Sequence, residues 1–168
     1  MGSGKTTVGR HLAEHLKLRF LDLDAYIEKK EKSTIADIFK NRGELYFRKR
    51  EYQYLLEVLG LQDDVVLSVG GGTPCYGSNI EAILGSTEAV FYLNVPIPQL
   101  VERLSQQKAQ RPLVRDISDE ALPEFIGKHL FERGAFYNRA YFTIYCGSKG
   151  PKTIATEALD ILDKIKSI

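Results

Sequence analysis

The chain has 168 residues, which suits a single domain with its own hydrophobic core, and we expect one domain over residues 1–168. Hydrophobic residues make up 43% and charged residues 27% of the sequence, so the composition is that of an ordinary globular protein. The net charge of +1 gives no general attraction for polyanions, and we therefore predict no nucleic-acid partner.

Neither a membrane span nor an export signal is indicated. No apolar run approaches the ~20 residues that cross a bilayer, and the N-terminus lacks the basic-then-apolar layout of a signal peptide. The two cysteines, Cys75 and Cys146, form no CxxC pair and have no spacing suited to zinc. We predict reduced thiols in a cytoplasmic monomer that has no membrane partner.

Hydrophobic residues recur at helical spacing in several segments. Val8, Leu12 and Leu16 predict a helix over residues 6–17, directly behind a glycine-rich start. Thr34 and Asp37 form a capping box that opens a short helix. The other predicted helices cover residues 24–31, 44–59, 98–107, 119–133 and about 154–165.

Short apolar runs predict the strands. Residues 65–69 and 89–93 are continuous apolar runs, which suit strands buried on both faces of a parallel sheet. Two more strands are predicted at 19–22 and 142–146. Strands that alternate with helices indicate an α/β fold, in which ligands bind at the carboxyl ends of the strands. We therefore expect Asp22, Gly70 and Asn94, which follow or end strands, to lie at one edge of the sheet.

A phosphate-binding loop opens the sequence. The segment matches the end of the pattern G-x-x-x-x-G-K-[ST], whose glycines let successive backbone N–H groups point at an anion. The following helix adds its positive N-terminal end. Lys5 is expected to reach the β- and γ-phosphates, and the Thr6 hydroxyl suits a Mg²⁺ ligand. The predicted nucleotide-binding residues are Gly2, Ser3, Gly4, Lys5, Thr6 and Thr7.

The pattern is incomplete at its start. Its first glycine would lie five residues before Gly4, upstream of Met1, together with the strand that normally delivers such a loop. We expect a truncated or mis-started sequence that folds poorly or is inactive, because loss of a central strand exposes two sheet edges. Restoring about ten upstream residues is expected to rescue it.

An acidic pair, Asp22 and Asp24, ends the first predicted strand. A spacing of two places both carboxylates on one side of an extended segment. Beside Mg²⁺ and phosphates, one carboxylate can hold the metal through water while the other takes a hydroxyl proton. The pair can equally cap the next helix, and this motif alone leaves both interpretations open.

Further motifs follow in order along the chain. They are Gly43-Glu44-x-x-Phe47-Arg48-x-x-Glu51, Gly70-Gly71-Gly72, Arg111-Pro112-Leu113, and Arg133 followed by Tyr137. Behind the phosphate loop and the acidic pair, this succession resembles the shikimate kinase family over about residues 1–145. No single motif is specific to this family, since phosphate loops are widespread and a glycine triplet alone is weak evidence. The motifs together, in this order, are specific.

The resemblance implies a site for a small carboxylated ring. Asp24 would bind the 3-hydroxyl of shikimate and serve as its base. Arg48 and Arg133 would hold the shikimate carboxylate, and Glu51 would orient Arg48. The chemistry agrees independently, because a planar, permanently charged guanidinium suits a carboxylate.

The resemblance also implies roles on the phosphate side. Asp22 would reach Mg²⁺ through water. The backbone of the triplet Gly70, Gly71 and Gly72 would approach substrate and γ-phosphate. Arg111 would close over the phosphates as the arginine of a lid, which excludes water from the reaction. The implied catalytic residues are Asp24, Lys5 and Arg111.

The implied fold is a three-layer P-loop kinase fold with a parallel sheet in the order 2-3-1-4-5. Strand 1, which lies between strands 3 and 4 in that order, is missing from this sequence. The four predicted strands are therefore strands 2 to 5. The resemblance places the substrate-binding segment at about residues 24–52 and the lid at about residues 107–118. It implies ATP and Mg²⁺ as cofactors and shikimate as the small-molecule substrate.

Other functions remain open from the sequence. A related small-molecule P-loop kinase, for gluconate or a nucleotide, would share the loop and the sheet. The arginines Arg48 and Arg133 favour a carboxylated substrate, but charge alone does not separate shikimate from gluconate. An inactive truncated homologue would be expected to lose Lys5, Asp24 or an arginine, and all are present.

Overall fold

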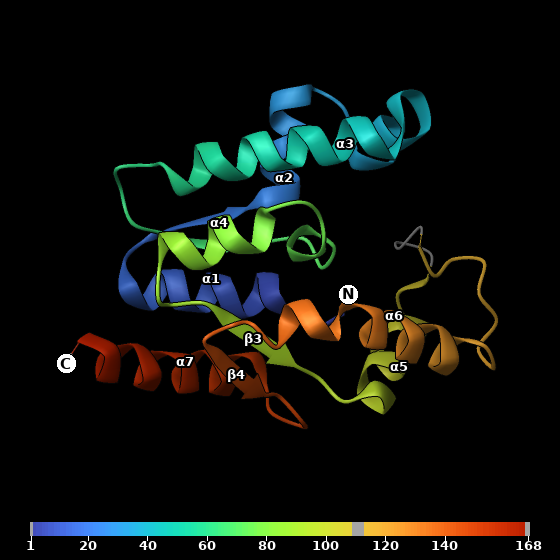
Figure 1. Cartoon of the computed structure of the whole chain (residues 1–168). Helices are drawn as coiled ribbons and strands as arrows, with labels where there is room; N and C mark the ends of the chain where they lie inside the picture. Colours follow the sequence, from blue (N-terminus) through green and yellow to red (C-terminus); the bar gives the residue numbers. More distant parts are fainter. Residues whose placement is uncertain (1, 109–112, 167–168) are drawn as a thin grey trace.

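The computed structural model describes residues 2–108 and 113–166, whose course is drawn in Figure 1. The helices are α1 Lys5–Leu16, α2 Leu23–Glu31, α3 Ile35–Leu59, the short 3₁₀ helix η1 Thr73–Cys75, α4 Asn79–Ser86, α5 Ile97–Ser105, α6 Leu122–Tyr137 and α7 Pro151–Lys166. The strands are β1 Arg19–Asp22, β2 Val65–Ser68, β3 Phe91–Asn94 and β4 Phe142–Tyr145. Of the helices described, none combines the length and the apolar character needed to cross a bilayer.

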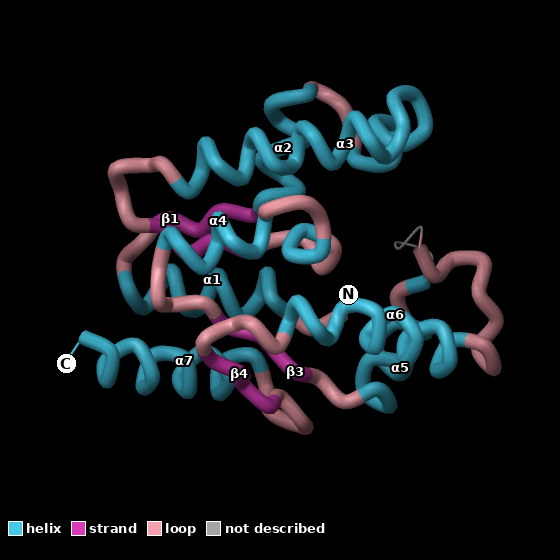
Figure 2. The backbone as a smooth tube through the Cα atoms, in the orientation of Figure 1, coloured by secondary structure: helices cyan, strands magenta, loops and turns pink. Residues whose placement is uncertain are grey.

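The strands pair in two parallel ladders, as Figure 2 shows. β1 pairs with β2 so that Asp22 lies opposite Ser68 at their carboxyl ends. β3 pairs with β4 so that Asn94 lies opposite Tyr145. In the predicted order 2-3-1-4-5 these are the pairs 2-3 and 4-5. They confirm an α/β fold with parallel strands.

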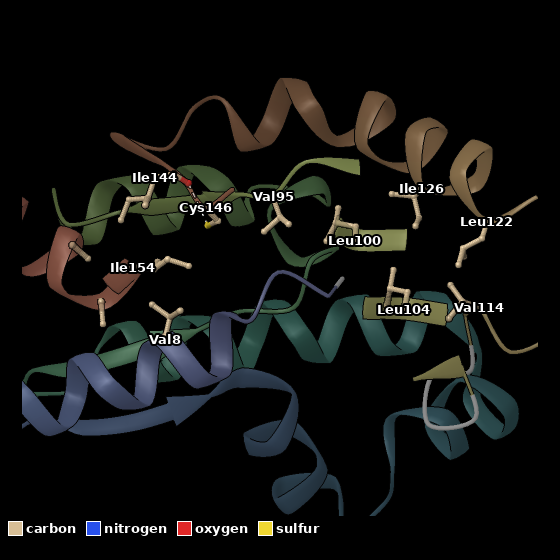
Figure 3. Close-up of a cluster of buried hydrophobic side chains, with 12 residues drawn as sticks. Val8, Val95, Leu100, Leu104, Val114, Leu122, Ile126, Ile144, Cys146 and Ile154 are labelled. Atoms are coloured by element: carbon tan, nitrogen blue, oxygen red, sulfur yellow. Dashed lines mark hydrogen bonds between the residues drawn. The ribbon is translucent and has the colours of Figure 1, made fainter. Parts of the chain in front are cut away.

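Each ladder has its own hydrophobic core. One cluster joins α1, α5, α6, β4 and α7 through buried side chains that include Val8, Leu104 and Ile144 (Figure 3). The other joins α2, α3 and α4 through side chains that include Leu23 and Leu55. The helices cover the ladders because apolar surface leaves water only where layers pack together.

A largely apolar cavity of about 150 Å³ lies between the two ladders. Its walls include Val69, which directly follows β2, Ile83 of α4 and Tyr92 of β3. Ser3 and Lys5 of the phosphate loop line it as well. The predicted order places its first strand between these two ladders, and none of the described residues forms a strand there. The loop, the strand ends and the cavity therefore meet in one region.

Several predicted boundaries were wrong. Residues 79–86 form α4, which the sequence did not predict because two turns are too short for a clear helical period. α6 begins at Leu122, with Pro123 in its first turn, rather than at 119. β3 begins at Phe91 rather than at 89, and α5 ends at Ser105 rather than at 107. α3 includes the short helix predicted to open at Thr34 and the helix predicted over residues 44–59. The two meet at a kink where Gly43 has φ +80°.

We predict that Leu55→Ala lowers the free energy of unfolding by about 2–5 kcal/mol, because Leu55 is fully buried and its loss leaves a cavity. Leu45→Ala on the same helix is the control, since that side chain is 86% exposed and its loss is expected to cost less than about 0.5 kcal/mol. Urea unfolding of both variants measures the difference. Equal losses would contradict the assignment of this core.

Candidate active site

The phosphate loop turns directly into α1. Gly2 and Gly4 have φ of +69° and +82°, a conformation that L side chains rarely adopt and glycine adopts freely. Gly4 is the N-cap of α1, whose first residue is Lys5. The free N–H groups of this first turn, which includes Thr7, form a site for an anion. The structure thus brings together the predicted loop residues that it describes.

The predicted metal residues are in contact. The Thr6 hydroxyl donates a hydrogen bond of 3.1 Å to Asp22 Oδ2. Asp22 Oδ1 accepts from the backbone N–H groups of Asp24 and Ala25 at 3.1 and 3.4 Å, so Asp22 also caps α2. The sequence left capping and metal binding as alternatives, whereas one oxygen of Asp22 caps the helix and the other faces Thr6.

Asp24 is placed by a helix rather than by an extended strand. The predicted extended geometry was wrong, because Asp22 is the N-cap and Asp24 lies in the first turn of α2. Burial raises the pKa of Asp24, the positive charge of Lys5 lowers it, and the carboxylates of Asp22 and Glu51 raise it. A Cβ at Gly70 would lie 3.0 Å from Asp24 Oδ1, so glycine there permits a close approach of backbone and carboxylate.

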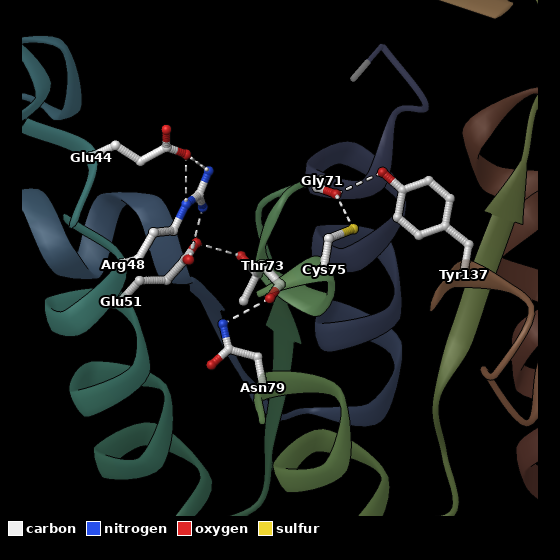
Figure 4. A network of polar contacts seen from close by, with 8 residues as sticks. All are labelled: Glu44, Arg48, Glu51, Gly71, Thr73, Cys75, Asn79 and Tyr137. Carbon is white, nitrogen blue, oxygen red and sulfur yellow. Dashed lines mark hydrogen bonds and ion pairs between the residues drawn. The ribbon is translucent and has the colours of Figure 1, made fainter. Parts of the chain in front are cut away.

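Arg48 is held in position by a buried carboxylate (Figure 4). Its Nη1 donates to Glu51 Oε2 at 2.9 Å, and Glu51 Oε1 accepts from the Thr73 hydroxyl at 2.8 Å. This confirms the contact by which Glu51 was expected to orient Arg48. The guanidinium also stacks on the ring of Tyr76, with its Cζ 3.7 Å from the ring centroid, and meets Glu44 at 3.4 Å.

Both predicted substrate arginines lie near Cys75, beside the glycine triplet. Burial raises the pKa of the Cys75 thiol, and the positive charges of Arg133 and Arg48 each lower it. A Cβ at Gly72 would lie 3.2 Å from Arg48 Nη2, so the triplet backbone touches one of these arginines. Arg133, from α6, therefore reaches the same region as Arg48, from α3.

Arg111 lies outside the described residues. The described flanks of the predicted lid are joined to each other, and one of them packs against the body of the protein. Lys108 Nζ donates to the backbone oxygen of Ile117 at 2.7 Å. The side chain of Val114 is fully buried against Leu104 and Leu122.

Some contacts of the site were not predicted from the sequence. Thr73 links the triplet to Glu51, and Asn79 Nδ2 donates to the Thr73 backbone oxygen at 2.7 Å. Arg103 of α5 donates to the Gly2 backbone oxygen at 3.4 Å and so contacts the phosphate loop. Thr73 could have been suspected from its position directly after the triplet, whereas nothing local marks Asn79 and no sharp motif marks Arg103.

A phosphate loop, a hydroxyl–carboxylate pair at its helix, and a glycine triplet that contacts a carboxylate and an arginine are the features of a P-loop phosphotransferase. Comparison with known proteins agrees with this class. A sequence model described as shikimate kinase matches residues 1–163. The chain therefore belongs to the shikimate kinase family, whose members use ATP to phosphorylate a hydroxyl group.

Individual relatives support this assignment. The chain is 38% identical to the shikimate kinase of Flavobacterium johnsoniae over 162 residues, which cover 96% of this chain and 94% of the relative. The crystal structure of the Bacteroides thetaiotaomicron shikimate kinase aligns with a TM-score of 0.85 at 31% identity, covering 100% of this chain and 94% of that one. The Acinetobacter baumannii shikimate kinase, solved in complex with shikimate, aligns with a TM-score of 0.88 at 35% identity, covering 99% and 90%.

We predict that Asp24→Asn raises the free energy of unfolding at pH 7. A carboxyl whose pKa is raised by folding favours the folded state only while protonated, and that contribution is lost as pH rises through the folded pKa. The ionised Asp24 thus opposes folding at neutral pH, and the neutral amide relieves this. The gain should vanish below about pH 3.9, the pKa of an unfolded aspartate.

Asp37→Asn is the matched control, because Asp37 is also an acid in the first turn of a helix but is exposed. It should lose a little stability at pH 7, since it only weakens the interaction with the helix N-terminus. Urea unfolding from pH 3 to pH 8 measures both variants. A loss of stability in Asp24→Asn at pH 7 would contradict the electrostatics of the site.

Proposed function

We propose that this protein transfers the γ-phosphoryl group of ATP to the 3-hydroxyl of shikimate, giving ADP and shikimate 3-phosphate. One observation carries the proposal: Asp24 lies against Gly70 at one end of the glycine triplet, Arg48 lies against Gly72 at the other end, and Arg133 and Arg48 both act on Cys75 just behind the triplet. This supports a site in which one carboxylate receives the hydroxyl proton and nearby cations bind the ring carboxylate.

Binding of the acceptor rests on Arg48 and Arg133. Arg48 is already fixed by Glu51 and by the Tyr76 ring, so little side-chain entropy is lost when a carboxylate binds. A guanidinium can donate two parallel hydrogen bonds to a carboxylate, which also sets the orientation of the ring. The backbone of Gly70, Gly71 and Gly72, which approaches Asp24 at Gly70 and Arg48 at Gly72, would line the floor of the substrate site.

Asp24 is the proposed general base. Its carboxylate accepts the proton of the 3-hydroxyl while that oxygen forms a bond to the γ-phosphorus, and the bond from the γ-phosphorus to the bridging oxygen of ADP breaks. Its raised pKa suits this task, because a carboxylate of higher pKa is a stronger base. Lys5, whose charge reaches Asp24, would stabilise the negative charge on the transferred group.

The other residues of the loop would hold the nucleotide. We propose that Gly2, Ser3, Gly4 and Thr7 contribute backbone or hydroxyl donors to the phosphates, and that Arg111 adds positive charge from a lid at about residues 107–118. The segment at about residues 24–52, which carries Asp24 and Arg48, is the proposed substrate-binding part of one domain.

Thr6 and Asp22 fit a magnesium ion. Mg²⁺ is usually held by one or two protein oxygens together with water and substrate phosphates, and the hydroxyl and the carboxylate are 3.1 Å apart. Within the described residues no cluster of three or more His, Cys, Asp or Glu side chains forms an all-protein metal site, so this pair is the candidate. A bound Mg²⁺ would neutralise charge on the β- and γ-phosphates.

We further propose that the enzyme works as a cytoplasmic monomer without a nucleic-acid or membrane partner. The net charge of +1 supports the absence of a polyanionic partner. Both Cys75 and Cys146 are free thiols, which suits a reducing compartment.

The proposal predicts acceptor specificity. In an assay that couples ADP release to NADH oxidation, the chain with about ten upstream residues restored should, with ATP and Mg²⁺, turn over shikimate and should not turn over gluconate or AMP. Asp24→Asn should lower turnover of shikimate by about 10²–10⁴-fold while ATP binding stays nearly unchanged, because the lost group acts on the acceptor.

Two results would count against this function. Turnover of gluconate or AMP without turnover of shikimate would overturn the assignment of the acceptor. Loss of ATP binding in Asp24→Asn would show that this carboxylate serves the nucleotide instead of the hydroxyl.

A further inference from the structure

The hydroxyl of Tyr137 makes a contact that the proposed chemistry does not use. It donates a hydrogen bond of 2.6 Å to the backbone oxygen of Gly71, the middle residue of the triplet (Figure 4). The two residues are 66 positions apart in sequence, and Tyr137 is the last residue of α6. This bond therefore ties the helix that carries Arg133 to the loop that touches Arg48 and Asp24.

The bond fixes the orientation of one peptide group. The C=O and the N–H of a planar trans peptide point in opposite directions, so a Gly71 oxygen held toward Tyr137 turns the Gly72 N–H away from it. Within the part of the chain that the structure describes, the N–H groups of Gly71 and Gly72 donate no hydrogen bond to the protein. Two adjacent glycines have little intrinsic preference for one orientation, so the contacts of the Gly71 oxygen select it. The Tyr137 hydroxyl at 2.6 Å is the shorter of these contacts, and the Cys75 thiol at 3.9 Å is the other.

The side chain of Tyr137 is itself held in place. Its ring packs against that of Tyr92, with centroids 5.1 Å apart and an interplanar angle of 33°. Burial raises the pKa of the Tyr137 phenol, so the hydroxyl keeps its proton and remains a donor. Arg133 lies four residues earlier on α6, and therefore on the same face of the helix.

We propose that Tyr137 is a positioning residue, which orients the Gly71–Gly72 peptide so that the Gly72 N–H is presented to an oxygen of the bound substrate. The same bond sets the distance between α6, with Arg133, and the triplet that lies against Arg48. This inference rests on the proposed function for the identity of the substrate. The orientation of the peptide group does not depend on it.

Tyr137→Phe tests the kinetic part of the proposal, because it removes the hydroxyl and keeps the ring on Tyr92. We expect kcat/KM for shikimate to fall about tenfold, as for loss of one net hydrogen bond, with the Kd for ADP unchanged. Tyr141→Phe is the matched control, since that hydroxyl also donates to a backbone oxygen, of Leu84 at 3.2 Å, but on an exposed surface. It should leave both constants unchanged.

Amide NMR tests the peptide orientation without any activity. In Tyr137→Phe the ¹H–¹⁵N signals of Gly71 and Gly72 should shift or broaden, and in Tyr141→Phe they should not. Unchanged glycine signals would overturn the proposal, and so would shifted signals with an unchanged kcat/KM for shikimate. Equal losses of ADP and shikimate affinity would show a merely structural role and also overturn it.

If the wild-type protein fails to phosphorylate shikimate, the proposed function is wrong, while the glycine signals still decide whether Tyr137 orients the peptide.

Discussion

Glu51 is a carboxylate whose residue is only 1% exposed, and a charge so buried is stable only when its partners replace the lost water. Its two oxygens are divided between the Arg48 guanidinium and the Thr73 hydroxyl. A single buried group of α3 thus fixes both the cation proposed to bind the acceptor carboxylate and the turn that follows the glycine triplet. The rest of the site is arranged around this interaction.

The glycine triplet is consequently held from two sides. Thr73 and Asn79 secure its end next to α3 and α4, and Tyr137 secures its middle carbonyl from α6. Asp24 packs directly against Gly70, where a Cβ would lie 3.0 Å from Oδ1 and would force the carboxylate to shift. Glycines alone would leave this loop flexible, but these contacts hold it in one conformation. Such preorganisation is what phosphoryl transfer requires.

Local sequence patterns were sufficient to predict much of the fold and part of the site. The phosphate loop and the four strands follow from spacing rules that act over a few residues, whereas helix capping by Asp22 was only one of two open alternatives. The bonds from Thr73 to Glu51 and from Tyr137 to Gly71 join residues 22 and 66 positions apart. Such contacts depend on which distant helices and loops pack together, and local patterns do not specify that, so the contacts themselves were not predicted.

Glu51 is proposed to act on the substrate through Arg48, and a double-mutant cycle on shikimate binding tests this coupling. The Kd for shikimate would be measured by calorimetry for the wild type, Glu51→Gln, Arg48→Lys and the double variant. The account predicts that Glu51→Gln weakens binding clearly in the wild type but hardly in the Arg48→Lys background, with a coupling energy above about 1 kcal/mol. Effects that add to within about 0.5 kcal/mol would contradict it.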